Sequence, residues 1–127
     1  MKIITLCGSL KFQKEMMEIA EKMALEGYCV LTPVYHVSSN IKRTEKQIEK
    51  LKEAHLKKIE LSDAILVINV NNYIGNSTNL EIEYAQKLNK EIMYYDEILK
   101  KLEPILVEIE YTMLLCLKVV YAKAIQE

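Results

Sequence analysis

The sequence predicts an α/β fold in which a parallel sheet of four or five strands lies between layers of helices. Segments with the composition of β-strands alternate four times with segments of helical periodicity along the 127 residues. Residues 63–70, DAILVINV, form an apolar run, as expected for a strand that is covered on both faces. Such an alternation favours right-handed crossovers that place helices on both sides of the sheet.

The size and composition are those of one globular domain spanning residues 1–127. Half of the residues are apolar, 28% are charged and the formal net charge is −1, so we expect neither a nucleic-acid partner nor a membrane-binding face. The longest apolar stretch, YTMLLCLKVVY, covers about half a membrane span and contains a lysine. The first ten residues do not resemble a secretory leader, and we therefore expect a cytoplasmic protein.

Three cysteines stand far apart in apolar surroundings, at Cys7, Cys29 and Cys116. Their odd number and their spacing favour buried free thiols in a reducing compartment over a disulfide or a zinc site. The sequence therefore predicts no metal and no cofactor.

The first half of the chain contains two predicted strands and two predicted helices. Residues 2–7 (KIITLC) form the first strand, and residues 10–26 form a helix whose apolar positions are Phe12, Met16, Ile19, Ala20 and Met23. Gly27 ends this helix, and residues 28–33 (YCVLTP) form the second strand. Thr44 and Gln47 make a capping-box pattern that begins a helix with Ile48, Leu51, His55 and Ile59 along one side.

The second half continues the alternation with residues 63–70 as a strand, 77–89 as a helix, 91–95 (EIMYY) as a strand and a long helical tail from about residue 96. The result is a flavodoxin- or Rossmann-like three-layer sandwich. In such folds ligands bind beyond the carboxyl ends of the strands, where the strand order reverses. Residues 8–9, 33–43 and 71–78 meet at that edge, so we expect the functional site there.

Glu81 is the candidate functional acid. On a helical wheel with about 100° per residue it falls inside the arc formed by Leu80, Tyr84, Ala85 and Leu88, whereas Glu83 falls on the opposite, solvent-facing side. An inward carboxylate at a ligand-binding edge suggests a functional role. The alternative is a capping box in which Thr78 begins the helix and Glu81 bonds back to its backbone amide. The two roles are compatible.

Four segments carry a resemblance to a known family: ITLCGSL, GYCVLTP, HLKKIELSDAILVIN and YIGNSTNLEIEYA. Over about residues 1–95 the chain resembles the nucleoside 2-deoxyribosyltransferase-like family, which includes transferases and 2'-deoxynucleoside 5'-phosphate N-hydrolases. The resemblance implies an enzyme that cleaves, and in some members transfers, the N-glycosidic bond of a nucleoside or nucleoside 5'-monophosphate. It also implies that Glu81 attacks the anomeric carbon and forms a glycosyl-enzyme ester.

The helix starts at this edge are candidate substrate-binding sites. Gly8 and Ser9 begin one helix, and their free amides and hydroxyl suit a phosphate or a sugar hydroxyl, the alternative being that Ser9 only caps the helix. The second helix start contains Gly75, Asn76, Ser77 and Thr78, which the resemblance assigns to the 5' group. Gly75 is expected to give the backbone freedom to bend, and capping alone is again the alternative.

The remaining candidates are less specific. His55 is either a hydrogen-bonded core residue or a catalytic one, and Tyr35 and His36 lie on the loop expected to contact the base. Residues 71–79 contain no Asp or Glu, although the transferases of the family place an additional acid there, so the proton donor is unassigned. The leading rival function is therefore a protein that binds a nucleotide or ADP-ribose-like ligand without turnover.

The tail, residues 96–127, carries a near-heptad apolar stripe at Ile98, Leu102, Ile105, Ile109, Met113, Leu117, Val120 and Ala124. A helix this apolar usually finds a second partner. We predict a homodimer or higher homo-oligomer through the tail, and the resemblance implies that a neighbouring subunit completes the site. The alternatives are packing within one chain, or a structural assembly module that binds no ligand.

Overall fold

The computed structural model describes residues 1–37 and 40–126, without the side chains of residues 102–110 and 126. The chain divides into two compact units, Met1–Asp96 and Glu97–Glu127, and each is described by itself. The division falls where the sequence predicts the start of the helical tail.

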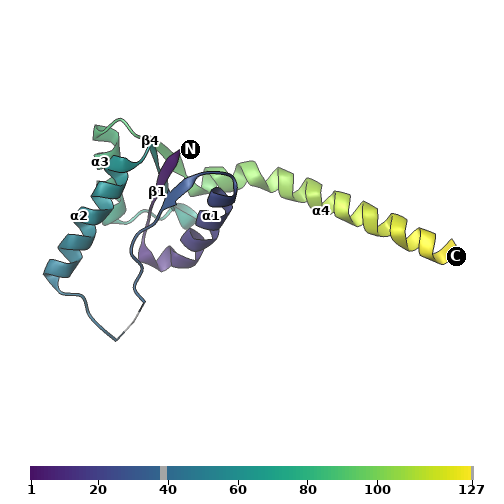
Figure 1. Cartoon of the computed structure of the whole chain (residues 1–127), viewed down its shortest axis with the longest axis horizontal. Helices are drawn as coiled ribbons and strands as arrows, with labels where there is room; N and C mark the ends of the chain where they lie inside the picture. Colours follow the sequence, from purple (N-terminus) through teal and green to yellow (C-terminus); the bar gives the residue numbers. More distant parts are fainter. Residues whose placement is uncertain (38–39, 127) are drawn as a thin grey trace. The chain divides into compact units, whose positions relative to one another are not determined.

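The first unit contains a sheet of four parallel strands (Figure 1). They are β1 (Ile3–Cys7), β2 (Cys29–Leu31), β3 (Ala64–Val67) and β4 (Glu91–Tyr94). The strand order is β2-β1-β3-β4, and every neighbouring pair is parallel. The chain runs outward from β1 to β2 and then returns to place β3 on the other side of β1. The strand order thus reverses between β1 and β3, which are hydrogen-bonded neighbours.

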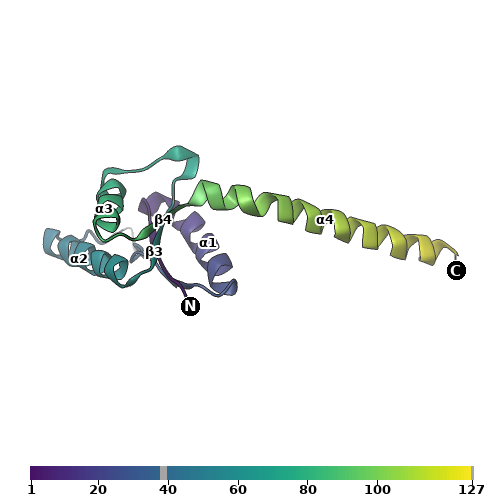
Figure 2. The same cartoon turned by 90° about the horizontal axis from the view of Figure 1, so that it is seen from above.

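Three helices cover the two faces of this sheet. Figure 2 shows α2 (Glu45–Leu61) and α3 (Asn76–Lys87) on one side and α1 (Gln13–Leu25) on the other. Short 3-10 turns, η1 (Leu10–Phe12) and η2 (Val70–Asn72), follow β1 and β3. The structure confirms the predicted three-layer α/β fold, with four strands.

The predicted capping box at the start of α2 is present. The Thr44 hydroxyl accepts a hydrogen bond from the Gln47 amide at 3.2 Å, and the Gln47 side chain accepts one from the Thr44 amide at 2.9 Å. Both free donors are therefore satisfied at the residue where the sequence predicts the helix to begin.

The core lies on both faces of the central strands. All four residues of β3 have no exposed surface, as expected for a strand covered on both sides. On the side of α2 and α3 the buried cluster is Cys7, Ile59, Ile65, Val67, Ile82 and Ala85. Side chains alternate along a strand, so the other face presents Ile4, Leu6 and Leu66 toward the α1 side, where Met16, Ile19 and Met23 are buried.

Two glycines near the sheet edge play different roles. A Cβ atom on Gly8 would lie 2.9 Å from Ile68 Cβ, so only glycine lets the chain after β1 pass the chain after β3. Gly75, in contrast, has φ −77° and ψ 170°, a conformation open to any residue. The bend attributed to Gly75 is instead made by Asn71 and Asn72, whose φ values are 52° and 62°. The expectation of a special backbone conformation at Gly75 is therefore wrong.

The second unit consists of the rest of α4 (Tyr95–Gln126), which begins directly after β4. Among the predicted stripe residues, Met113, Leu117 and Val120 are each more than 60% exposed. The side chains of Leu102, Ile105 and Ile109 lie outside the described residues. Within the part of the chain that the structure describes, no helix has both the length and the apolarity to cross a membrane.

The three cysteines are free thiols, but only Cys7 is buried. Cys29 is half-buried and Cys116 is exposed. The prediction of three buried thiols is therefore wrong for Cys116, because it lies on α4, where every described side chain from residue 111 to 125 is exposed.

Substituting Gly8 tests the close approach of β1 and β3. We expect Gly8→Ala to lower the free energy of unfolding by about 1–3 kcal/mol, because the added methyl overpacks a buried contact. In Gly75→Ala, the matched control, the new atom would meet nothing closer than the Tyr73 hydroxyl at 3.6 Å. That control should stay within about 0.5 kcal/mol of the wild type. Chemical denaturation measures both, and equal effects would contradict this account of Gly8.

Candidate functional site

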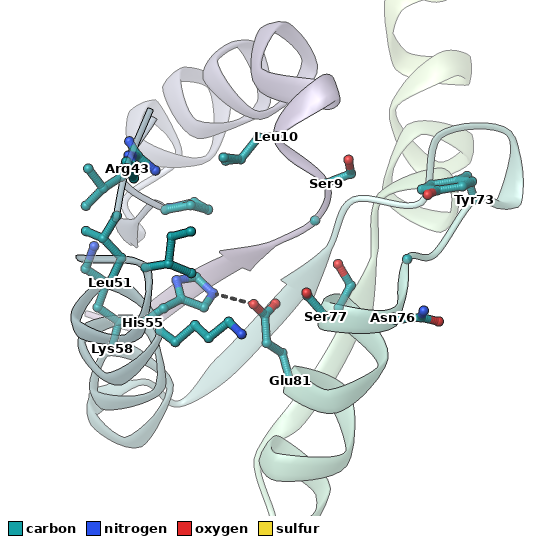
Figure 3. Close-up of a pocket in the computed structure, with 17 residues that line it drawn as sticks. Ser9, Leu10, Arg43, Leu51, His55, Lys58, Tyr73, Asn76, Ser77 and Glu81 are labelled. Atoms are coloured by element: carbon teal, nitrogen blue, oxygen red, sulfur yellow. Dashed lines mark ion pairs between the residues drawn. The ribbon is translucent and has the colours of Figure 1, made fainter. Parts of the chain in front are cut away.

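A cavity of about 410 Å³ lies at the carboxyl ends of β1 and β3. The three predicted segments meet there, since the walls include residues that follow β1, β2 and β3. Figure 3 shows this pocket, with the side chains of His55 and Glu81 pointing toward each other and in contact. Of the other predicted site residues, those that line it are Gly8, Ser9, Gly75, Asn76, Ser77 and Thr78.

Glu81 does not belong to a capping box. Helix α3 begins at Asn76 with Gly75 as its N-cap, so Thr78 is already the third helical residue and Glu81 lies in the second turn. The alternative in which Thr78 caps the helix and Glu81 bonds back to it is therefore wrong. The Glu81 carboxylate is free for another role.

The buried side of α3 differs from the side that the helical wheel predicts. The buried residues of α3 are Thr78, Ile82 and Ala85, whereas Leu80, the reference of the predicted arc, is 66% exposed. The buried arc is thus rotated away from Leu80, and Glu81 lies at its edge. With a side chain 22% exposed, Glu81 faces the cavity and lies neither in the core nor in bulk water.

Glu81, His55 and Cys7 form one cluster. His55 Nε2 lies 3.6 Å from Glu81 Oε1 and 3.5 Å from Cys7 Sγ. Glu81 Oε2 and His55 Nδ1 are buried without a hydrogen-bond partner. Burial raises the pKa of the Cys7 thiol well above its ordinary value, and the nearby Glu81 carboxylate raises it further. His55 is therefore not a core histidine with both ring nitrogens hydrogen-bonded, which was the alternative to a catalytic role.

Three positively charged side chains share the cavity with Glu81. Arg43, Lys52 and Lys58 line the same cavity, and Lys58 Nζ donates a hydrogen bond to the Thr32 carbonyl at 2.8 Å. Sequence reasoning did not identify Lys52 or Lys58. The available signal was their spacing, since each lies three residues from His55 and therefore on the same side of α2.

Ser9 has a capping role as well as a place in the cavity wall. Its hydroxyl accepts a weak hydrogen bond from the Lys11 amide at 3.4 Å, at the start of η1. Opposite α2, Tyr73 completes the wall, with Lys11 Nζ 3.2 Å from its ring centroid and Phe12 in edge-on contact. Sequence reasoning missed this aromatic contact, because Phe12 ends η1 after β1 whereas Tyr73 follows η2 after β3.

Tyr35 and His36 do not line the Glu81 cavity. They lie in a neighbouring hollow of about 490 Å³, which shares Val34, Arg43 and Leu51 with the first. Burial raises the pKa of the Tyr35 hydroxyl. The expected loop thus reaches the site through Pro33, Val34 and Arg43, and not through the two residues singled out from the sequence.

Comparison with known proteins shows a similarity of structure. No protein-family model matches the chain, and no curated protein sequence matches it. A solved structure does match. The chain is similar to a 2-desoxiribosyltransferase from Leishmania mexicana, with a TM-score of 0.56 and 18% sequence identity over 75% of this chain. It spans 64% of the length of that structure, and at this identity the similarity shows a shared fold alone.

The raised pKa of Cys7 predicts a loss of stability at alkaline pH. The unfolded thiol releases its proton near its ordinary pKa of 9.0 while the folded one keeps it, so stability falls as the pH rises above that value. The slope is at most about 1.4 kcal/mol per pH unit. Denaturation between about pH 8 and about pH 10 measures it, and Cys7→Ala should flatten it. The control Cys29→Ser/Cys116→Ser should keep the slope, and a slope unchanged in Cys7→Ala would contradict the assignment.

Proposed function

We propose that the protein cleaves the N-glycosidic bond of a nucleoside or nucleoside 5'-monophosphate, with Glu81 as the nucleophile. The observation that carries this proposal is the Glu81 carboxylate, which borders a 410 Å³ cavity and has one buried oxygen without a partner. The volume lies in the range of small-molecule sites. The similarity in fold to a deoxyribosyltransferase supports the same substrate class.

The proposed reaction proceeds by covalent catalysis. A Glu81 oxygen attacks the anomeric carbon as the bond to the base breaks, and the electron pair of that bond leaves with the base, which takes up a proton. The carboxylate stabilises the positive charge that develops on the sugar before the ester forms. Water then opens the ester and gives hydrolysis, whereas a second base gives transfer.

His55 positions the nucleophile in this proposal. Its Nε2 atom contacts Glu81 Oε1 at 3.6 Å and so fixes the carboxylate in the cavity wall. Glu81 is the one carboxylate among the described residues that line the cavity. The proton for the departing base therefore comes from His55, from a hydroxyl of the wall or from water, and not from a second acid in residues 71–79.

The charges around the cavity support an anionic substrate. Residues 76–78 are the first three of α3, so their backbone amides are free of helical hydrogen bonds, and Asn76, Ser77 and Thr78 all line the cavity. These amides favour a 5'-phosphate at the start of α3, and Arg43, Lys52 and Lys58 add positive charge elsewhere in the cavity wall. Tyr73 offers a ring against which a base can stack.

Glu81→Gln tests the nucleophile. The amide keeps the size of the side chain but cannot form the ester, so release of free base from a panel of deoxynucleosides and their 5'-monophosphates should fall by about 10³-fold or more. Glu83→Gln is the matched control, because Glu83 lies two residues away and is exposed. Chromatography of the released base measures both. An unchanged rate in Glu81→Gln would exclude Glu81 as the nucleophile.

The rival function is binding of a nucleotide or ADP-ribose-like ligand without turnover, and it is supported by the lack of a second carboxylate among the described residues of the cavity wall. Calorimetric titration with the same nucleotide panel distinguishes the two functions. Binding without release of base from the wild-type protein would favour the rival.

We also propose that the protein acts in the cytoplasm as a homodimer or higher homo-oligomer associated through α4. The exposed apolar residues of α4 support this association, and its described part includes Tyr111, Met113, Leu114, Leu117, Val120 and Tyr121. Free thiols at all three cysteines agree with a reducing compartment.

Charged substitutions on α4 test the oligomer. We expect the triple variant Met113→Glu/Leu117→Glu/Val120→Glu to sediment as a monomer, because three carboxylates would have to be buried in the interface. The control Lys118→Glu/Ala122→Glu, on the other side of the helix, should keep the wild-type mass. Sedimentation equilibrium measures the mass. A wild-type protein that is already monomeric at all concentrations would contradict the proposal.

A further inference from the structure

We propose that Cys7, His55 and Glu81 form a binding site for a thiophilic divalent cation, with Zn²⁺ as the ion that fits the donor set. The three side chains offer one sulfur, one nitrogen and one oxygen ligand, and these atoms all lie within 4.8 Å of one another. They come from three different elements, β1, α2 and α3, which the fold brings to one point. The site is therefore invisible in the spacing of the sequence.

The distances match a tetrahedral ion. Zinc bonds of about 2.3 Å to sulfur and about 2.0–2.1 Å to nitrogen or oxygen place tetrahedral ligands about 3.6 Å apart for S···N and about 3.3 Å apart for N···O. The observed separations are 3.5 Å for Cys7 Sγ to His55 Nε2 and 3.6 Å for His55 Nε2 to Glu81 Oε1. The third separation, from Cys7 Sγ to the Glu81 oxygen, is within 4.8 Å, against about 3.6 Å in a tetrahedral site, so an ion that binds here draws the Glu81 side chain about 1 Å toward the sulfur.

The unsatisfied atoms of the cluster support a ligand at this point. Glu81 Oε2 is buried and makes no hydrogen bond. Leaving a buried carboxylate oxygen unpaired is costly, and a cation among the three side chains would satisfy it. His55 and Glu81 also line the cavity, so the fourth coordination position is open to a water molecule from there.

The chemical types of the three donor atoms determine which metal ion the site favours. Thiolate and imidazole ligands favour zinc and related ions, whereas Mg²⁺ and Ca²⁺ require sites made of oxygen ligands. When the ion binds, the Cys7 thiol loses its proton to solvent, and the sulfur donates an electron pair to the metal. No oxidant or reductant takes part in this step.

Binding has a consequence for turnover, and this part rests on the proposed function. A carboxylate that coordinates a cation cannot attack a sugar carbon, so Zn²⁺ and substrate compete for Glu81. The cluster would then make the enzyme sensitive to inhibition by zinc.

Cobalt substitution tests the site in the full-length protein. Titration of the reduced, metal-free wild type with Co²⁺ should produce a thiolate-to-cobalt charge-transfer band in the near ultraviolet, and Zn²⁺ should displace it. The variants Cys7→Ser, His55→Gln and Glu81→Gln should each weaken binding by about 100-fold, since each loses one ligand. Mg²⁺ should give no competition.

The chain supplies a matched control for every ligand. Cys29→Ser/Cys116→Ser removes the two other thiols, His36→Gln removes the other histidine, and Glu83→Gln removes the neighbouring acid. All three controls should keep the charge-transfer band and the wild-type affinity. Circular dichroism of each variant without metal shows whether the fold is intact, and His55→Gln and Glu81→Gln keep the test valid if Cys7→Ser does not fold.

The outcomes separate the two proposals. A band that survives in Cys7→Ser, or that is lost in Cys29→Ser/Cys116→Ser, would overturn the metal site whether or not the enzyme releases base. A metal-dependent band in a protein that never releases base would support the site and contradict the proposed function. Competition between zinc and substrate is confirmed if zinc slows release of base by the wild type, and it is overturned if saturating zinc leaves the rate unchanged.

Discussion

The parallel pairing of β1 with β3 is the constraint on which the rest of this structure depends. The pairing brings the chain after β1 against the chain after β3, so closely that Gly8 leaves no room for a side chain beside Ile68. It places Cys7, the last residue of β1, next to α2 and α3, which pack side by side on one face of the sheet (Figures 1 and 2). The cavity, the acid and the thiol follow from this one contact between residues far apart in the sequence.

The site places one carboxylate among several positive or neutral polar groups. Glu81 contacts His55 on one side. Arg43, which precedes α2, and Lys52 and Lys58, which lie on α2, line the same cavity. This arrangement underlies the proposed nucleophile and, with Cys7, the proposed metal site, and both proposals use the same carboxylate.

The fold could be predicted from the sequence because its signals are local. The apolar run of β3 and the capping box at Thr44 each depend on residues within one turn or one strand. The sequence placed Glu81 at the ligand-binding edge, and it lines the cavity there. The predicted wheel and helix start were both displaced, since α3 begins at Asn76 and its buried side includes Thr78 in place of Leu80. What could not be predicted depends on contacts between elements. Cys7 meets His55 across 48 positions of sequence, and Tyr35 lies in a different hollow from the one that its loop suggests.

The contact between Gly8 and Ile68 also determines which part of the pocket can move. The chain after β1 packs so closely on Ile68 that Gly8 has no room for a Cβ atom, and this contact forms a rigid floor, because any opening there would break the pairing of the central strands. The outer wall of the cavity is packed less densely than the floor, since Ile48 and Lys52 on α2 are exposed to solvent. The rim of the cavity is therefore the part that can shift, while the floor, where Gly8 packs against Ile68, keeps its geometry.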